Sequence, residues 1–304
     1  MRILVTDGMD KSAMAALREQ GHEVVEQFYE PDQLGAALRD FDAVVVRSKT
    51  KVRANHIDEA KGGKLKLIIR GGVGVDNIDV KYAEANGITV KNTPKASSQS
   101  VAELALGHMF ACARYISIAG ATMREDKWEK KAYGKGVELS GKTLGVIGLG
   151  AIGKRVAAVA SAFGMKVSYY SPSGTSHCSD YPSIPLDQLM SESDVISVHA
   201  PLNERTDGLV GERELALMKP EAIIVNMGRG GIVSEKALAD AIDAASIGGA
   251  ALDVFVKEPL PADSPLLHTA HPELLRLTPH TAWASVEARQ RLAHGVAENI
   301  RKGW

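Results

Sequence analysis

The feature that most constrains this chain is a glycine-rich turn in its middle. Residues 143–147 read as a short buried strand, the next six are GLGAIG, and residues 154–163 continue as a helical pattern. Gly148, Gly150 and Gly153 thus form G-x-G-x-x-G between a strand and a helix. There the first glycine permits a tight turn, the second lets a pyrophosphate approach the backbone, and the third lets the helix pack on the strand. The sequence predicts a dinucleotide site at this helix N-terminus.

Strand-like runs rich in β-branched residues alternate with helical patterns on both sides of the turn. The 304 residues are enough for roughly two domains of about 150 residues each. This βαβ alternation predicts an α/β protein with two doubly wound parallel-sheet, Rossmann-like domains, the first of them flavodoxin-like. The predicted strands lie at 3–6, 23–27, 43–47, 65–69 and 88–90 before the turn, and at 143–147, 166–170, 195–199, 222–226, 249–254 and 274–277 from the turn onward.

Two long apolar stretches, residues 100–119 and 285–300, read as continuous helices that flank the second unit. Such a pair of helices carries the chain into the second domain and back again. We therefore predict a discontinuous first domain, 1–97 with 285–304, that binds substrate. The dinucleotide-binding domain is predicted at 98–284.

The charge balance excludes some classes of partner. The chain has 36 basic and 37 acidic residues, so no general positive field favours nucleic acid or a membrane surface. Only Cys112 and Cys178 are present, which fits a reducing compartment and gives no metal-ligand spacing. We expect a cytoplasmic protein with no membrane span and no metal site.

Functional side chains follow three of the later strands, at the sheet edge where doubly wound proteins bind ligands. Arg229 follows one strand, Glu258 follows the strand that ends near Asp253, and His280 follows the last strand. This set is sufficient for hydride transfer to a 2-keto acid. Arg229 would bind the carboxylate and polarise the keto oxygen. His280 would donate the proton, while Glu258 orients the ring and stabilises its protonated form.

The chain resembles the D-isomer-specific 2-hydroxyacid dehydrogenases over nearly its whole length. The matching segments are GGVGVDNID at 71–79, SVAEL at 100–104, GLGAIG at 148–153, NMGRGGIV at 226–233, ALDVF at 251–255 and TPH at 278–280. The resemblance implies that Arg229 binds substrate, that Glu258 supports His280 and that His280 is the acid/base. It also implies that backbone N–H groups of Gly72, Val73 and Gly74 bind the substrate carboxylate.

The same resemblance implies a set of cofactor contacts. They are Gly148, Gly150, Ala151, Ile152, Gly153, Ser171, Ala200, Pro201, Met227, Gly228, Asp253, His280 and Ala282.

Within the family, the front half is most similar to phosphoglycerate dehydrogenases. The similarity lies in VRSKTKV at 46–52, IRGGVGVDN at 69–77 and NTP at 92–94. Arg47 and Arg70 would then supply the cations for a substrate phosphate, with Lys49 or Lys51 as further helpers, and Ser48 would also contact the substrate. The segment PHTAWA at 279–284 is instead more similar to glycerate or hydroxypyruvate reductases. Because the chain stops at Trp304, we expect it to lack the C-terminal amino-acid-sensing domain of many phosphoglycerate dehydrogenases.

The cofactor prediction is NAD, with NADP left open. NAD enzymes usually carry an acidic residue about 20 residues beyond the glycines, but here the sequence is Tyr170-Ser171-Pro172-Ser173. No carboxylate repels a 2′-phosphate, and no arginine or lysine before Asp180 holds one. Ser171 is able to hydrogen-bond either cofactor, so selectivity should be relaxed.

Three functions remain open on this evidence. The first is NAD-dependent oxidation of D-3-phosphoglycerate at the entrance to serine synthesis. The second is a glyoxylate/hydroxypyruvate reductase or another D-2-hydroxyacid dehydrogenase, and the third is a dinucleotide-sensing scaffold of the co-repressor type. A homodimer is expected in each case, because the predicted helix at 100–119 is apolar on more than one face.

Overall fold

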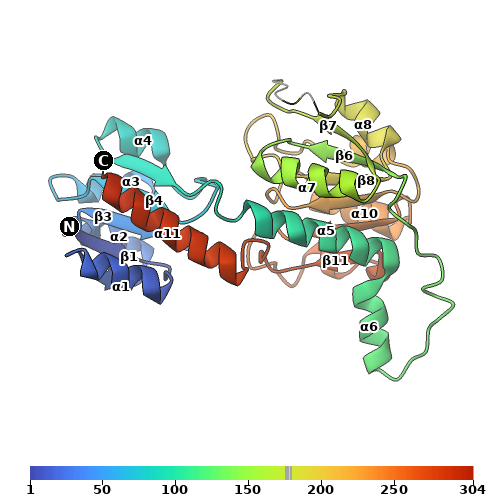
Figure 1. Cartoon of the computed structure of the whole chain (residues 1–304), viewed down its shortest axis with the longest axis horizontal. Coiled ribbons are helices and arrows are strands. Elements are labelled where there is room, and N and C mark those ends of the chain that lie inside the picture. Colours follow the sequence, from blue (N-terminus) through green and yellow to red (C-terminus); the bar gives the residue numbers. More distant parts are fainter. Residues whose placement is uncertain (175–177, 179, 304) are drawn as a thin grey trace. The chain divides into compact units, whose positions relative to one another are not determined.

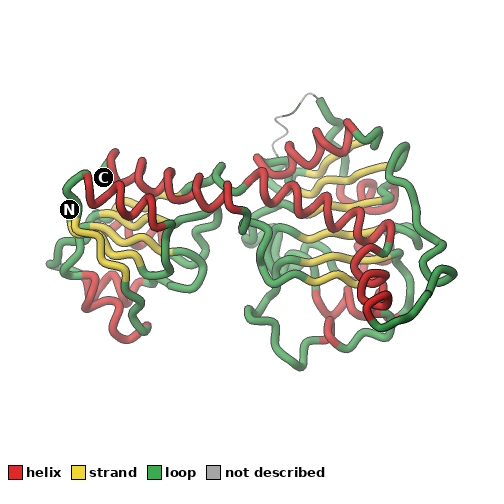
Figure 2. Tube along the Cα trace, turned by 60° about the horizontal axis from the view of Figure 1, so that its bottom comes forward, coloured by secondary structure: helices red, strands yellow, loops and turns green. Residues whose placement is uncertain are grey.

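The computed structural model describes residues 1–174, 178 and 180–303, and these form two compact units (Figure 1). The first unit is Met1–Ser98 with Trp283–Trp304, and the second is Gln99–Ala282. Trp304, where the first domain is predicted to end, lies outside the described residues. Each unit has one parallel sheet with helices on both faces (Figure 2). The predicted α/β class with two parallel-sheet, Rossmann-like domains is confirmed.

The sheet of the first unit has the strand order β2-β1-β3-β4-β5, which is the flavodoxin-like order. Its strands are β1 (Arg2–Val5), β2 (Glu23–Glu26), β3 (Ala43–Val46), β4 (Leu67–Arg70) and β5 (Thr89–Asn92). Its helices are α1 (Lys11–Glu19), α2 (Pro31–Leu38), α3 (Ala54–Ala60), α4 (Val80–Ala85) and α11 (Val286–Lys302).

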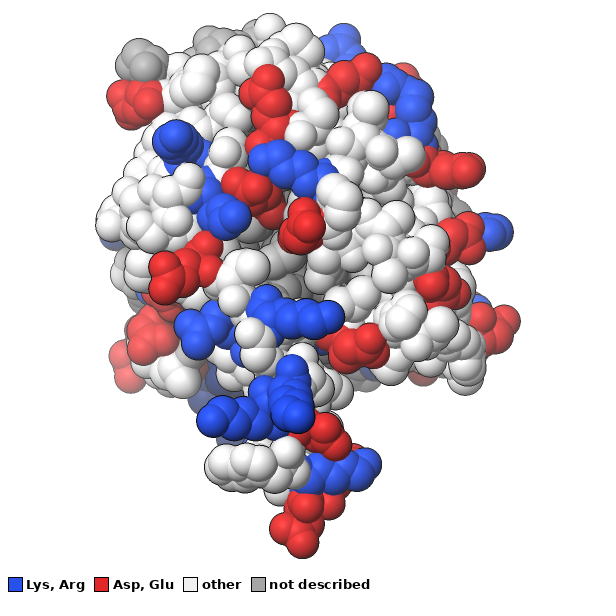
Figure 3. All heavy atoms as spheres, turned by 90° about the vertical axis from the view of Figure 1, so that its right-hand side faces the viewer, with Lys and Arg blue, Asp and Glu red and all other residues white. Residues whose placement is uncertain are grey.

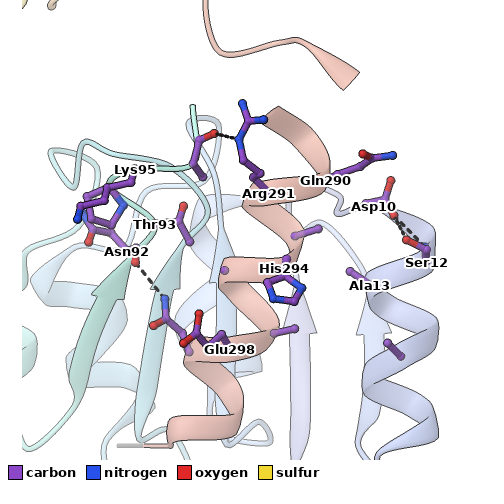
Figure 4. Close-up of a pocket in the computed structure, with 17 residues that line it drawn as sticks. Asp10, Ser12, Ala13, Asn92, Thr93, Lys95, Gln290, Arg291, His294 and Glu298 are labelled. Carbon is purple, nitrogen blue, oxygen red and sulfur yellow. Dashed lines mark hydrogen bonds between the residues drawn. The ribbon is translucent and has the colours of Figure 1, made fainter. Parts of the chain in front are cut away.

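Both faces of this sheet are buried, because successive side chains of a strand point to opposite faces. In β1, Leu4 joins one apolar cluster, while Ile3 and Val5 join another. The second cluster also includes Val296 and Ile300 of α11. The C-terminal helix is therefore part of the core of the N-terminal unit. It is also tied to the segment after β5: Arg291 Nε donates to the Ala96 carbonyl at 2.8 Å (Figure 4).

The second unit has a six-stranded parallel sheet in the order β11-β10-β9-β8-β6-β7. Its strands are β6 (Thr143–Ile147), β7 (Lys166–Tyr170), β8 (Val195–Val198), β9 (Ile223–Asn226), β10 (Gly249–Leu252) and β11 (Leu275–Leu277). The α-helices are α5 (Ser98–Arg114), α6 (Ile116–Arg124), α7 (Ala151–Ala162), α8 (Leu186–Glu192), α9 (Glu212–Ala216) and α10 (Glu235–Asp243). Two 3₁₀ helices, η1 (Pro265–Leu267) and η2 (Pro272–Leu274), lie between β10 and β11.

The prediction of one continuous helix over 100–119 is wrong. Tyr115 adopts the left-handed conformation, with φ of 56°, and this ends α5 and turns the chain into α6 across a 65° bend. No residue of α6 is buried. Among the described residues no single helix has the length and apolar character of a membrane span, and α5 and α6 meet that test only when they are taken together.

Candidate active site

The glycine turn after β6 gives each of its three glycines a different steric role. Gly148 has φ of +93°, and a Cβ added there would lie 2.7 Å from the backbone nitrogen of Ala200. At Gly153 an added Cβ would lie 2.4 Å from the Gly148 carbonyl, so helix and strand approach too closely for a side chain. At Gly150 no described atom lies within 4 Å of an added Cβ.

Packing within the protein therefore does not require a glycine at position 150. It is the N-cap of α7 and offers no side-chain cap, and the first turn of α7 carries no acidic residue. The N–H groups of that turn, including those of Ala151 and Ile152, are accordingly placed to meet an anion. This open cradle fits the pyrophosphate of a dinucleotide.

Two loops border this turn. Ala200 and Pro201 follow β8, and the Pro201 carbonyl is held by Thr206 Oγ1 at 2.6 Å. Ser171 follows β7, is partly exposed and lies with its Oγ 2.9 Å from Ser173 Oγ. The stretch from Ser171 to Gly174 has no carboxylate, and residues 175–177 and 179 of the same loop lie outside the described part of the chain.

The loop after β9 holds Arg229. Buried Asn226 accepts a bond from Gly228 N at 3.0 Å and donates one to the Arg229 carbonyl at 3.1 Å, so it fixes the turn that contains Met227. Arg229 itself donates from Nη1 to the Gly228 carbonyl at 2.9 Å. The sequence reasoning missed Asn226, although an amide at a strand end before a glycine is a recognisable turn signal.

Glu258 and His280 are brought together from two loops. His280 Nδ1 lies 2.7 Å from Glu258 Oε2, and Glu258 Oε1 accepts a bond from Phe255 N at 3.1 Å. Burial opposes ionisation of Glu258, but the bonds from His280 and Phe255 and the charge of Arg229 outweigh it. They hold the pKa of this carboxyl below its usual value. Glu258 is therefore an anion at neutral pH, and the three predicted catalytic residues belong to one unit.

Asp253 fixes the loop that carries His280. Its side chain is buried and accepts bonds from Thr278 Oγ1 at 2.6 Å, Thr281 N at 2.8 Å and Ala282 N at 2.8 Å. His280 has φ of 51°, a conformation that a residue other than glycine adopts only under such constraints. The structure thus gives Asp253 a positioning role, and its contact with the cofactor stays a prediction.

The first unit holds the predicted substrate residues on two loops. After β3, the Asp7 carboxylate accepts bonds from Arg47 N at 2.7 Å and Thr50 N at 3.0 Å, while Asn77 Nδ2 donates to the Arg47 carbonyl at 2.6 Å. Ser48 is exposed between these anchors. The Arg47 guanidinium lies over the Trp283 ring, 3.9 Å from its centroid. Asp7, Asn77 and Trp283 were not predicted as site residues.

After β4, Arg70 turns back over its own loop. Its Nη1 donates to the Gly71 carbonyl at 2.9 Å, and a Cβ added at Gly72, where φ is +152°, would fall 1.3 Å from that nitrogen. Val73 is exposed, its carbonyl accepts a bond from Asn92 at 2.7 Å, and Gly74 is half-buried. Arg70 therefore covers the loop predicted to bind the substrate carboxylate, whereas Arg47 lies on the neighbouring strand end.

Comparison with known proteins agrees with this arrangement. Residues 106–282 match the family model described as "D-isomer specific 2-hydroxyacid dehydrogenase, NAD binding domain". The chain is 44% identical to a hydroxypyruvate reductase of Thermotoga maritima, covering 99% of this chain and 97% of the relative. It is also 44% identical to a D-3-phosphoglycerate dehydrogenase of Methanocaldococcus jannaschii, covering 99% of this chain but only 57% of that longer protein.

Among solved structures, an acyclic imino acid reductase in complex with NADPH and D-Arg is similar, with a TM-score of 0.90 and 31% identity. The match covers 99% of this chain and 96% of that one.

Proposed function

This chain belongs to the D-isomer specific 2-hydroxyacid dehydrogenase family, and we propose that it oxidises D-3-phosphoglycerate to 3-phosphohydroxypyruvate. It is an NAD-dependent oxidoreductase. Residues 1–97 with 285–304 would bind the substrate, and residues 98–284 would bind the dinucleotide. In a cell this reaction would run in the cytoplasm at the entrance to serine synthesis.

The observation that carries the proposal is the 2.7 Å pairing of His280 Nδ1 with the Glu258 carboxylate. This bond fixes the ring and directs its other nitrogen, Nε2, to the substrate. NAD would supply the hydride acceptor when it is bound. His280 Nε2 would take the proton of the C2 hydroxyl, and Glu258 would stabilise the resulting cation. Arg229 binds the substrate carboxylate and the oxygen that becomes the keto group.

The phosphorylated substrate is favoured by the local cations of the first unit. Arg47 directly follows β3, and Arg70 is the last residue of the adjacent strand β4. A net charge of −1 provides no general attraction for anions. A charge-assisted bond to phosphate changes affinity by about tenfold to a hundredfold. Replacing either arginine by Ala should lower kcat/KM for phosphohydroxypyruvate by about that factor and leave hydroxypyruvate nearly unaffected.

A second candidate is reduction of hydroxypyruvate or glyoxylate. The observation in its favour is sequence identity, because the chain is 44% identical to the hydroxypyruvate reductase of Thermotoga maritima, as it is to the D-3-phosphoglycerate dehydrogenase of Methanocaldococcus jannaschii. Initial rates of NADH oxidation with phosphohydroxypyruvate, hydroxypyruvate and glyoxylate separate the two. The highest kcat/KM is expected for phosphohydroxypyruvate, and a preference for either unphosphorylated acid rejects the phosphoglycerate assignment.

We also propose a homodimer that forms through α5 and α6. Ile116 and Met123 of α6 are more than half exposed, and Trp128 just beyond it is 79% exposed. Lys and Arg side chains lie together with Asp and Glu side chains at the lower end of the face shown in Figure 3, where α6 projects. The exposed basic residues of this stretch include Arg124, Lys127, Lys130, Lys131 and Lys135. Sedimentation at micromolar concentration should give twice the chain mass, and a monomer would refute the proposal.

A further inference from the structure

The first unit contains a cavity of about 410 Å³ at the carboxyl ends of β1 and β3. Its walls include Gly8 from the loop after β1, Arg47 from the loop after β3 and Gly71 from the loop after β4. Val286 and Arg289 from the first turns of α11 close it. A volume in this range is typical of small-molecule sites, which run from about 300 to 1,000 Å³.

The strand order of the sheet explains why a cavity lies at this position. From β1 the chain moves outward to β2, and it then returns to the other side of β1 to form β3. The connections on either side of the β1–β3 boundary therefore run in opposite directions and leave a crevice at the carboxyl ends of the strands. In doubly wound sheets this switch point is where ligands bind.

The charges that line the cavity favour an anion. Desolvation lowers the pKa of the Arg47 guanidinium, the nearby Asp7 carboxylate offsets part of this effect, and the charge of Arg289 adds to it. The two guanidinium groups thus lie near enough to repel each other. Across residues 1–174, 178 and 180–303, no carboxylate forms an ion pair with either of them. Lys11 adds a third cation to the wall.

The acidic residues of the cavity are engaged elsewhere. Asp7 accepts bonds from the backbone at Arg47 and Thr50 and from the Thr50 hydroxyl. Asp10 turns its carboxylate to Ser12, where it caps α1 by accepting from Ser12 N at 3.0 Å (Figure 4). Both acids serve the fold of their own loops, although their charges also act on the two arginines, Asp7 on Arg47 and Asp10 on Arg289. With Arg47, Arg289 and Lys11 set against these two carboxylates, the wall of the cavity carries one positive charge in excess.

The guanidinium of Arg47 is also oriented for binding. Its Cζ lies over the Trp283 ring, 3.9 Å from the centroid, and this contact holds the guanidinium in place at the wall of the cavity. Arg289 lies in the second turn of a helix whose N-terminal end carries partial positive charge. The charge of Glu287 in the first turn of α11 offsets part of this field.

We propose that this cavity binds a dianionic phosphoryl group between Arg47 and Arg289, and that Arg289 determines the preference for a phosphorylated substrate. The identification of that group as the phosphate of the substrate rests on the proposed function. The anion site itself rests on the cavity and its charges. The proposal concerns binding alone, and it involves no covalent step.

The test compares Arg289→Gln, which removes the charge, with Arg289→Lys, which keeps it. Arg301→Gln is the matched control, since Arg301 is an exposed residue of the same helix that does not line the cavity. Arg289→Gln should lower kcat/KM for phosphohydroxypyruvate by about tenfold to a hundredfold and leave hydroxypyruvate unchanged. Arg289→Lys should recover part of the loss, and Arg301→Gln should change neither substrate.

Titration of inorganic phosphate by calorimetry at constant ionic strength gives a readout that does not depend on turnover. The wild-type protein should bind phosphate, and Arg289→Gln should lose that binding. If the wild type prefers phosphohydroxypyruvate but Arg289→Gln leaves both turnover and phosphate binding unchanged, the inference fails and the proposed function stands. If phosphate binding needs Arg289 while phosphohydroxypyruvate is a poor substrate, the anion site stands and the proposed function fails.

Discussion

His280 Nδ1 lies 2.7 Å from Glu258 Oε2, although the two residues are 22 positions apart in the chain. The bond joins the loop after β10 to the loop after β11, two neighbouring strands of one parallel sheet. Because the pair forms within a single unit, its geometry is set by that sheet alone. The imidazole is therefore oriented before substrate arrives.

Loss of the imidazole should abolish most of the activity. We expect His280→Ala to lower kcat by about 10²–10⁴-fold, the usual contribution of a general acid/base, while NADH binding persists in a fluorescence titration. Because His280 has a positive φ, Ala also adds backbone strain. His280→Asn is the matched variant, since Asn tolerates that conformation. Full activity in either variant would contradict the assigned role.

Asp253→Asn should disturb the loop that carries His280, although Asp253 itself is not predicted to contact the substrate. The amide replaces one acceptor oxygen by a donor, so at least one of the loop groups that now bond to Asp253 loses its partner. A buried group left unpaired costs about 1–3 kcal/mol, which urea unfolding would measure together with a fall in kcat. Asp263→Asn, at an exposed position, is the control. Equal behaviour of the two variants would rule out the positioning role.

Gly150→Ala and Gly153→Ala should fail in different ways. An added methyl at Gly150 meets open space, so the melting temperature should hold while NADH affinity falls by about tenfold or more, equivalent to at least about 1.4 kcal/mol. At Gly153 the methyl meets the Gly148 carbonyl, and overpacking of this kind costs about 1–3 kcal/mol of stability. Unchanged NADH affinity in Gly150→Ala would show that the pyrophosphate lies elsewhere.

Ser171→Asp should raise the preference for NAD over NADP. The new carboxylate would repel a 2′-phosphate and accept bonds from the ribose hydroxyls. The measurement is the ratio of kcat/KM for the two cofactors in the wild type and the variant. A wild type that already strongly prefers NADP would mean that another group recognises the 2′-phosphate.

His199 should make the protein less stable in mild acid. Burial lowers the pKa of His199 from 6.5 to about 3. Its Nδ1 is buried with no partner among the described residues, although the residue as a whole is partly exposed. The unfolded chain binds a proton below pH 6.5 and the folded chain does not, so the free energy of unfolding should fall as the pH drops from about 6.5. The slope is at most about 1.4 kcal/mol per pH unit.

His199→Gln removes this titration and keeps a polar atom near Ser197, whose Oγ lies 2.8 Å from the histidine Nε2. Urea unfolding at pH 7, 6 and 5 should therefore show a shallower pH dependence in the variant. Identical slopes would show that the ring is protonated in the folded protein.

The sheet architecture was predictable because parallel strands buried on both faces leave continuous apolar runs between glycine turns. Each predicted strand lies within one or two residues of its position in the structure. The break at Tyr115 was not predictable in this way, because neither Gly nor Pro marks it and the apolar pattern continues into α6. The left-handed conformation there is set by tertiary context, which a local pattern does not contain.

The site residues also differ in whether the sequence could predict them. Arg229, Glu258 and His280 follow strands directly or within a few residues, so strand order alone predicts that they share one sheet edge. Arg289 is different, because it lies on a helix that follows the second unit in sequence and packs on the first unit in space. Its proximity to Arg47 depends on that packing, which no local spacing encodes.

The position of α11 also sets an order for the synthesis of this protein. The face of the first sheet that carries Ile3 and Val5 is covered in part by Val296 and Ile300, which leave the ribosome almost 300 residues after β1. Residues 99–282, by contrast, contain every strand of their own sheet and are able to fold as a unit once they have emerged. The first unit to be translated is therefore the last to complete its core, and until then the part of its apolar sheet face that α11 covers is open to chaperones and to other nascent chains.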